Sequence, residues 1–266
     1  HDCGKVATPP HVVDKGTKLE TIFDRIELIK TRMELLKRDA EIAFLRRQLN
    51  GQKIKKHDAE YLKTISNINE DIKFLEKCNI GGEYMEKSLQ EKVKSIGAVP
   101  IIINGEKQNL LTQEEINNLN IPKGTLLPEE REIINDHIVI TIEMLENLPY
   151  PRNLKNVPEF AGGHHEKIDG TGYPKGLKGS QMSTQAKIMA IADIYEALTA
   201  ADRPYKDGKK LSQAMRIMGF MKNDHHIDKD LFEIFVKSGV YKKYAEKYVA
   251  KNQIDDVDEL SVIAKK

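Results

Sequence analysis

Two adjacent histidines, His164 and His165, begin the part of the sequence that is richest in groups able to bind metal and phosphate. Neutral imidazoles bind borderline divalent metals such as iron, manganese and zinc, and neighbouring imidazoles in an irregular segment can reach two ions. A turn with Gly170, Gly172 and Pro174 follows. Glycine lets a backbone approach a ligand closely because it has no Cβ. The run therefore predicts a metal and phosphate site.

A carboxylate downstream of this turn indicates the same chemistry. Residues 183–200 have the spacing of a helix, on which Asp193 shares one face with Ala186, Ala190 and Ala197. An unpaired carboxylate among small apolar side chains would be strongly destabilising. We therefore expect a cation beside Asp193.

These residues resemble the HD-GYP family, the branch of the HD phosphohydrolases that hydrolyses cyclic di-GMP. The resemblance covers about residues 1–20 and 128–235. A His-Asp dipeptide alone is a weak signal, but paired histidines followed by this loop are highly specific. The residues that carry it are His1-Asp2-Cys3-Gly4-Lys5, His164-His165-Glu166, Asp169-Gly170-Thr171-Gly172-Tyr173-Pro174, Asp193 and Arg203-Pro204-Tyr205-Lys206.

The resemblance implies a metal-dependent phosphodiesterase that holds two or three divalent ions, with iron or manganese favoured. It assigns Asp2 and Lys5 to catalysis, with Asp2 bridging two ions and Lys5 touching the substrate phosphate. The implied metal ligands are His1, Asp2, His137, His164, His165 and Asp193. The implied substrate-binding residues are Lys5, Asp169, Gly170, Gly172, Tyr173, Pro174, Arg203 and Lys206. The implied product is linear pGpG, and further cleavage to GMP is left open.

Two assignments rest on the resemblance more than on residue type. A lone histidine on the buried face of a helix, such as His137, is more often a core residue than a ligand, yet the family places a metal ligand on this helix. Glu166 could act as an acid or a base by its type. The resemblance makes it a supporting or helix-capping residue, so it is left out of the catalytic set.

Composition limits the other classes of function. The chain has 266 residues, with 42 basic and 41 acidic side chains and a net charge of +1, so nothing favours nucleic acid or an acidic membrane as a partner. Two cysteines are too few for a disulfide framework and suit a reducing cytoplasm. No apolar run approaches the ~20 residues of a membrane span.

The segment between the two parts of the motif has a different pattern. Apolar residues alternate in steps of three and four, as in a coiled coil, and a second such run follows Asn50-Gly51. We predict an antiparallel helical hairpin, followed by a small β-hairpin near residues 100–111 with its turn at Asn104-Gly105. The two runs are Leu19, Ile22, Ile26, Ile29, Met33, Leu36, Ala40, Ala43 and then Tyr61, Ile65, Ile68, Ile72, Leu75.

The predicted fold is mostly α, an HD-type helical bundle interrupted by this long helical hairpin. Residues 1–18 would begin the catalytic core, 19–127 form the insertion, 128–252 resume the core and 253–266 form a mobile tail. The residues 128–148 are expected to be one helix. The apolar stripe of the hairpin either packs its two arms on each other or mediates a homodimer, and both interpretations stay open.

The chain begins with His inside a motif, so we interpret it as a fragment of a longer bacterial signalling protein. The family places further metal ligands upstream, so activity is expected of the parent, with a sensory or receiver domain ahead, rather than of the fragment alone. Two alternatives remain: an inactive cyclic-dinucleotide sensor or interaction module, and an HD hydrolase of another nucleotide.

Overall fold

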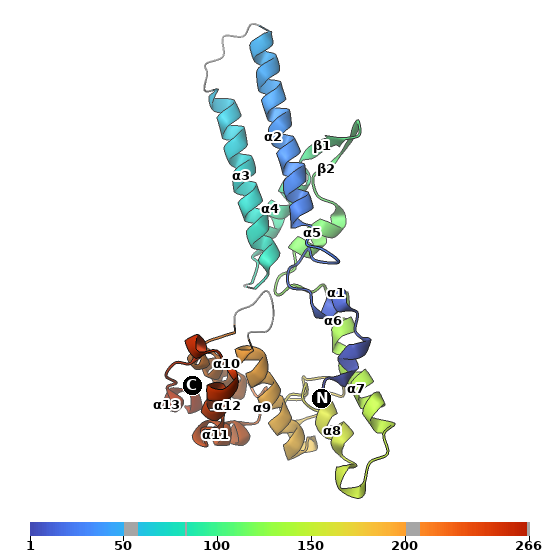
Figure 1. Ribbon diagram of the computed structural model, residues 1–266, viewed down its shortest axis with the longest axis vertical. Helices are drawn as coiled ribbons and strands as arrows, with labels where there is room; N and C mark the ends of the chain where they lie inside the picture. Colours follow the sequence, from blue (N-terminus) through green and yellow to red (C-terminus); the bar gives the residue numbers. More distant parts are fainter. Residues whose placement is uncertain (51–57, 83, 201–207, 265–266) are drawn as a thin grey trace. The chain divides into compact units, whose positions relative to one another are not determined.

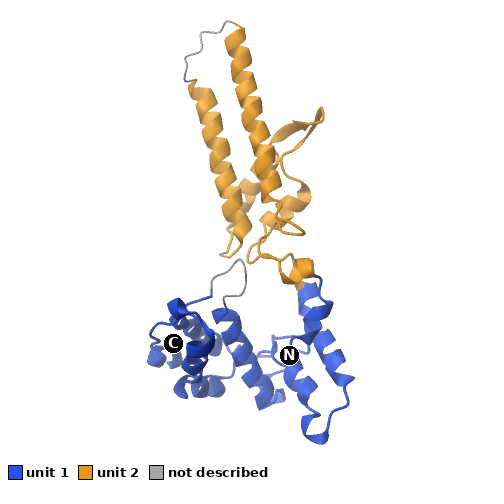
Figure 2. Cartoon of the chain, in the orientation of Figure 1, with its two compact units in different colours: residues 1–9, 132–266 blue, residues 10–131 orange. Residues whose placement is uncertain are grey.

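The computed structural model describes residues 1–50, 58–82, 84–200 and 208–264, and it is mostly helical with a single two-stranded sheet among these residues (Figure 1). The predicted mostly α fold is confirmed. The chain divides into two compact units, one of residues 1–9 and 132–266 and the other of residues 10–131 (Figure 2). These limits differ from the sequence-based boundaries after residues 18 and 127, and each unit is described separately.

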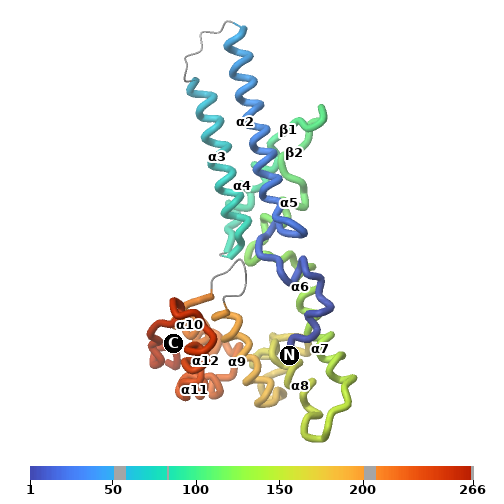
Figure 3. The backbone as a smooth tube through the Cα atoms, viewed as in Figure 1, coloured from blue at the N-terminus to red at the C-terminus, as the bar shows by residue number. Residues whose placement is uncertain are grey.

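The second unit is built on two long helices, α2 (Ile26–Leu49) and α3 (Ala59–Ile80), which run side by side in opposite directions (Figure 3). Asp58 caps the start of α3, its side chain accepting from the Glu60 N–H. Ile29 and Met33 of the predicted stripe are buried against Leu75 of α3. The inner stripe of α2 therefore packs within the unit.

The unit also contains smaller elements. They are α1 (Pro10–Val13), α4 (Lys87–Gly97), the antiparallel strands β1 (Pro100–Ile103) and β2 (Glu106–Asn109), and α5 (Gln113–Leu119). Of these, α4, β1 and α5 contribute buried residues to the core that the hairpin shares. The Arg32 guanidinium makes a bidentate ion pair with the buried Glu115 carboxylate, at 2.7 and 2.8 Å, and this pair fixes α2 to α5. Ile22 differs from the prediction, because it precedes α2 and is 97% exposed.

The segment expected to be one helix, 128–148, is two. Helix α6 (Pro128–Asn135) ends before Asp136, and α7 (His137–Glu146) begins after it. The ring of His137 hydrogen-bonds the Ile134 carbonyl oxygen, and a side chain that engages a helix carbonyl in this way interrupts the regular backbone ladder.

The first unit continues with a series of helices, and the last five α-helices surround one apolar core. They are η1 (Cys3–Ala7), η2 (Arg152–Leu154), α8 (Val157–Gly162), η3 (Gly179–Gln181), α9 (Thr184–Thr199), α10 (Leu211–Asn223), α11 (Lys229–Lys237), α12 (Val240–Tyr248), η4 (Lys251–Gln253) and α13 (Glu259–Ile263). Tyr195, Phe232 and Tyr241 are buried at the centre of this core.

The C-terminal segment corrects the expectation of a mobile tail. Val262 of α13 is buried in the core beside α10 and α11. The Lys222 ammonium donates to the carbonyl oxygens of Val262, Ile263 and Ala264, at 3.4, 2.6 and 3.3 Å. A cation at the end of a helix stabilises its unpaired carbonyls, so the segment to residue 264 belongs to the fold.

Candidate metal centre

The His-Asp pair is held against helix α7, because Gly4 lets the segment that follows the pair pack very closely on that helix. The Gly4 N–H donates to Thr141 Oγ1 at 2.9 Å. A Cβ on Gly4 would overlap the His137 carbonyl oxygen and stand 2.7 Å from the Thr141 amide nitrogen. Segment η1, which begins directly after Asp2, can therefore lie on α7 only with glycine at this position.

Two histidines are held with one ring nitrogen bonded to the backbone. The Nδ1 atoms of His137 and His164 pair with the carbonyl oxygens of Ile134 and Ala161, the latter at 2.6 Å. A carbonyl can only accept, so Nδ1 carries the proton and the Nε2 lone pair is free. Both side chains are buried. This is the usual arrangement of a histidine that ligates metal through Nε2.

The free nitrogens converge on the carboxylate of Asp2. Asp2 Oδ1 lies 3.2 Å from His137 Nε2 and 3.7 Å from His164 Nε2, while His165 Nε2 lies 3.2 Å from His137 Nε2. The ligand atoms of these four residues lie within 4.8 Å of one another. Among the described residues, His164 Nε2 and Asp2 Oδ1 are buried without a hydrogen bond.

A divalent ion fits this group. Two nitrogens bound at about 2.1 Å to one tetrahedral or octahedral ion lie roughly 3.0–3.4 Å apart. The 3.2 Å between the Nε2 atoms of His165 and His137 agrees with that spacing. An ion would satisfy the buried acceptors that have no hydrogen-bond partner among the described residues. Side chains that lay together by chance would not leave buried acceptors unsatisfied in this way.

A second group shares Asp2. His1 Nε2 lies 3.2 Å from Asp193 Oδ1 and 3.5 Å from Asp2 Oδ2, and the three ligand atoms lie within 4.8 Å of one another. Asp193 thus faces the imidazole of His1, and the cation expected beside Asp193 stays a prediction. The two oxygens of Asp2 face the two groups, and this supports a bridging role for Asp2.

The surroundings keep these side chains in the protonation states that metal binding requires. Burial, and then the neighbouring His164 and His137, lower the pKa of His165 to about 4. Burial likewise lowers the pKa of His164. Burial alone would raise the pKa of Asp2, but the ammonium of Lys5, which donates to Oδ2 at 2.6 Å, helps to bring it well below its usual range. At neutral pH the site therefore offers neutral imidazoles at His164 and His165 and a carboxylate at Asp2.

Lys5 lies at the edge of the centre. Its ammonium donates to Asp2 Oδ2 at 2.6 Å, and its side chain is 40% exposed. The structure thus brings both predicted catalytic residues together. A partly exposed ammonium beside the cluster can also meet a phosphate.

The loop after the histidines folds back onto them. The Tyr173 ring stacks on His165 with 4.7 Å between ring centroids, and the Tyr173 N–H donates to the His165 carbonyl oxygen at 3.2 Å. Pro174 follows a cis peptide bond. Gly172 packs against the backbone of Glu166 so closely that a Cβ would overlap it. The loop therefore fixes the orientation of the His165 ring.

Other predicted loop residues have local roles. Asp169 accepts from the N–H and hydroxyl of Thr171, both at 2.8 Å, and these bonds lower the pKa of its exposed carboxyl. Gly170 has a φ of +84°, which favours glycine. The structure does not bring the Asp169 side chain into the metal groups. Arg203 and Lys206 lie outside the described residues, so their assignment stays a prediction.

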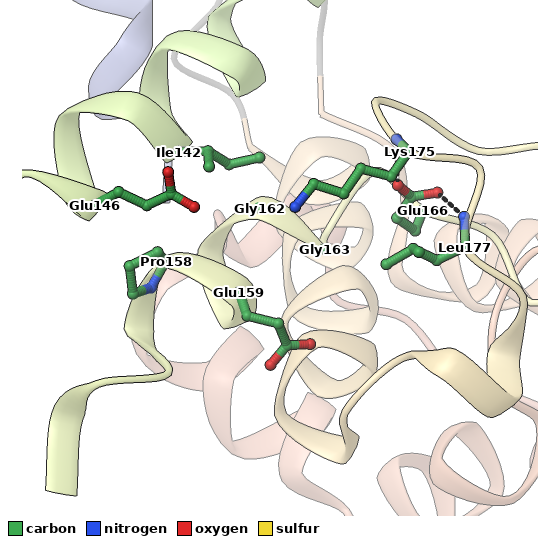
Figure 4. Close-up of a pocket in the computed structure, with 9 residues that line it drawn as sticks. All are labelled: Ile142, Glu146, Pro158, Glu159, Gly162, Gly163, Glu166, Lys175 and Leu177. Carbon is green, nitrogen blue, oxygen red and sulfur yellow. Dashed lines mark hydrogen bonds between the residues drawn. The ribbon is translucent and has the colours of Figure 1, made fainter. Parts of the chain in front are cut away.

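Glu166 has a positioning role that sequence reasoning could name only in general terms. Its buried carboxylate accepts from the N–H groups of Lys175 and Leu177, at 2.7 and 2.8 Å (Figure 4). It also lines a small cavity of about 70 Å³ beside α8. Glu166 therefore joins the histidine pair to the far end of the loop. Thr141 and Gly4 were missed as supports, although glycine within the His-Asp motif was a signal.

Comparison with known proteins agrees with this geometry. Residues 113–231 match the HD domain family. The match does not reach the His-Asp pair at residues 1 and 2, which the fold brings to the same site. None of the described helices combines the length and apolar character needed to cross a lipid bilayer.

Curated relatives match shorter stretches of the chain. A 3′3′-cGAMP-specific phosphodiesterase of Vibrio cholerae is 42% identical over 82 residues, which are 31% of this chain and 19% of the relative. A cyclic di-GMP phosphodiesterase of Pseudomonas aeruginosa is 47% identical over 79 residues, 29% and 18% of the two chains. A cyclic di-GMP phosphodiesterase response regulator of Xanthomonas campestris is 36% identical over 92 residues, 35% and 24%.

The chain thus covers 18 to 24% of the length of these three relatives. The HD domain match and the relatives named as cyclic di-GMP phosphodiesterases agree with the resemblance to the HD-GYP family that the loop at residues 169–174 indicated. Activity and substrate of the whole protein are treated as proposals below.

Proposed function

We propose that this protein is a metal-dependent phosphodiesterase that hydrolyses cyclic di-GMP to pGpG. The observation that carries the proposal is the pair of ligand groups that share Asp2, with His164 Nε2 and Asp2 Oδ1 buried and unsatisfied among the described residues. The relatives named as cyclic di-GMP phosphodiesterases support the substrate.

The chain's own side chains divide the work. Asp2, His137, His164 and His165 would hold one ion, and His1, Asp193 and the other Asp2 oxygen a second. Bound iron or manganese would supply Lewis acidity and lower the pKa of a water toward neutrality. Whether a third ion binds depends on ligands beyond these two groups.

Two further groups act on the substrate and on the ligands in this proposal. Lys5 donates to Asp2, and its remaining N–H groups could offset negative charge on a phosphoryl oxygen. Tyr173 holds the His165 ring by stacking, so His165 approaches the ion in one orientation. Arg203 and Lys206 are proposed to bind the phosphate or guanine of the ligand.

The substrate has a second candidate because one relative is named for 3′3′-cGAMP. The test is hydrolysis of cyclic di-GMP and of 3′3′-cGAMP in parallel, under anaerobic iron or manganese loading, with product identified as the linear dinucleotide or as mononucleotides. The proposal expects higher kcat/KM for cyclic di-GMP. A reversed preference would assign the protein to 3′3′-cGAMP. Metal and ligand binding without turnover would favour a sensor.

The setting of the domain is proposed from the same relatives. A relative that is a response regulator favours an upstream receiver or sensory domain, acting in the cytoplasm. A homodimer through the helical insertion also stays a prediction.

A further inference from the structure

The chain passes between the two units twice, once after Pro9 and once after Arg131. Both crossings lead directly to residues of the candidate metal centre. Before the first crossing, η1 begins directly after Asp2. After the second crossing, helix α6 ends at Asn135, two residues before His137. Within this chain, the covalent path between Asp2 and His137 therefore runs through the whole second unit.

Lys15 links the two segments that make these crossings. Its side chain is 1% exposed, and its ammonium donates to both carboxylate oxygens of Glu130, at 2.7 and 2.8 Å, and to Asn118 Oδ1 at 3.0 Å. The Lys15 carbonyl oxygen accepts from the Thr125 hydroxyl at 3.1 Å. Glu130 lies in the first turn of α6. Lys15 therefore holds the helix that leads to His137.

Lys18 forms a second link between the same segments. Its buried ammonium donates to the carbonyl oxygens of Leu119 and Ile121, at 3.0 and 2.8 Å. We call the bonds from Lys15 and Lys18 to residues 118–130 the joint. A buried ion pair adds little net stability compared with apolar side chains of similar volume. The specific consequence of the joint is that it fixes which two segments meet.

The joint shortens the connection between η1 and α7. Without it, a loop of about 130 residues would connect them, whereas with it about 15 residues do, from the end of η1 to Lys15 and from Glu130 to α7. The probability that the two ends of a flexible loop meet falls roughly as the 3/2 power of its length. The joint therefore raises the local concentration of η1 at α7 by up to about 25-fold. The factor is smaller where other contacts of the second unit also hold its ends together.

We propose that Lys15 and Lys18 are positioning residues for the metal centre, because they hold the two ends of the second unit together and so keep η1 docked on α7, where Asp2 meets His137. The consequence for metal binding rests on the proposed function. The docking of η1 on α7 does not, since it can be measured without metal.

The test is hydrogen exchange at the Gly4 N–H in the metal-free protein. This group donates to Thr141 Oγ1 at a buried contact and becomes free to exchange when η1 leaves α7. Lys15→Met should accelerate its exchange about 3- to 25-fold, and Lys18→Met should act in the same direction. Glu130→Gln keeps an oxygen for the Lys15 ammonium but removes the charge, so it should accelerate exchange less than Lys15→Met does.

Manganese affinity, measured by calorimetric titration, should fall by no more than the same factor. The complete ligand set exists only in the docked state, so the apparent dissociation constant rises as the docked fraction of the protein falls. A variant with faster Gly4 exchange should therefore never bind manganese more tightly than the unchanged protein.

The matched control for Glu130→Gln is Glu115→Gln. It removes the charge of another ion-paired carboxylate in the second unit, but the pair of Glu115 with Arg32 joins α2 to α5 and not the two crossing segments. We expect Glu115→Gln to leave Gly4 exchange unchanged. Amide exchange in α10, in the core of the first unit, should be the same in every variant. If Lys15→Met unfolds the second unit, the comparison of Glu130→Gln with Glu115→Gln remains decisive.

Gly4 exchange that responds to neither Lys15→Met nor Glu130→Gln would overturn the proposal. So would equal acceleration by Glu115→Gln, because the effect would then come from the stability of the second unit as a whole. If the joint variants accelerate exchange as expected but the unchanged protein binds no manganese, the metal centre of the proposed function fails and the role of the joint in docking η1 stands.

Discussion

Gly4→Ala should weaken metal binding strongly although it alters no ligand. Gly4 follows the His-Asp pair by two residues, and its backbone lies against the carbonyl of His137. An added methyl group would overlap that oxygen and stand 2.7 Å from both the amide nitrogen and the Oγ1 of Thr141. These are backbone and short side-chain atoms that cannot swing aside, so segment η1 must move away from α7.

The expected magnitude follows from two contributions. Overpacking in a close contact costs about 1–3 kcal/mol. Loss of the hydrogen bond from the Gly4 N–H to Thr141 Oγ1 costs about 1 kcal/mol more. We therefore expect Gly4→Ala to lower the free energy of unfolding by about 2–4 kcal/mol. Because Asp2 moves with η1, we expect manganese affinity to fall at least 10- to 100-fold.

The assay is calorimetric titration with manganese, together with urea unfolding of the metal-free protein. Cys3→Ala is the matched control, because Cys3 is the adjacent residue and its side chain is exposed. The control should bind manganese as the unchanged protein does. Manganese bound by Gly4→Ala with unchanged affinity and stoichiometry would refute the reasoning that the glycine places the His-Asp pair.

Three further predictions concern the loop and the second unit. Glu166→Gln should lower turnover of cyclic di-GMP about tenfold and leave metal content unchanged, because a neutral amide bonds the loop N–H groups more weakly than a carboxylate does. Turnover and metal content are measured together, and turnover equal to that of the unchanged protein would contradict this. Tyr173→Ala should weaken metal binding about 2- to 10-fold through loss of the stack on His165, whereas Tyr173→Phe should not, and calorimetry that found the two alike would count against it. Burial alone would raise the pKa of Glu115, but Arg32 and the Thr112 backbone lower it below the usual 4.5. The ionised carboxylate therefore stabilises the fold above about pH 4.5, and this stabilisation is lost as the pH falls through the folded-state pKa. Glu115→Gln should flatten this acid limb in urea unfolding at a series of pH values, and an unchanged limb would show that another group controls it.

Much of the candidate site could be predicted because its residues are contiguous in short motifs. Residue type alone indicated metal chemistry at His164, His165 and Asp193, and the resemblance added His1, Asp2 and His137. The structure places all six in the two groups that share Asp2, which supports their proposed role as ligands. Their spatial meeting depends on long-range packing, because His1 and Asp193 are 192 positions apart.

The supports of the site were harder to foresee. Nothing in the local sequence shows that Gly4 will meet Thr141, because the contact joins residues 137 positions apart. The role of Glu166 depends on where the chain returns at Lys175 and Leu177. The break between α6 and α7 depends on a side chain bonding a carbonyl rather than on proline or glycine.

The helical hairpin shows how periodicity can mislead about surfaces. The predicted stripe correctly identified two long helices, yet its exposed and buried members could not be separated without knowing where α3 and α5 lie. Ile29 is fully buried, whereas Leu28, next to it in sequence, is 43% exposed. The exposed apolar residues of α2 can be told from its buried ones only in the folded structure, because both sets have helical spacing.

The most direct test of the central claim is turnover of cyclic di-GMP by the protein loaded anaerobically with iron or manganese, compared with the Asp193→Ala variant. Asp193 lies 3.2 Å from His1 in the second ligand group, so its loss should reduce metal content and abolish formation of pGpG. Turnover that disappears in Asp193→Ala is the predicted result. Turnover that survives the substitution, or its absence from the unchanged protein with metal and ligand bound, would contradict the proposed metallophosphodiesterase.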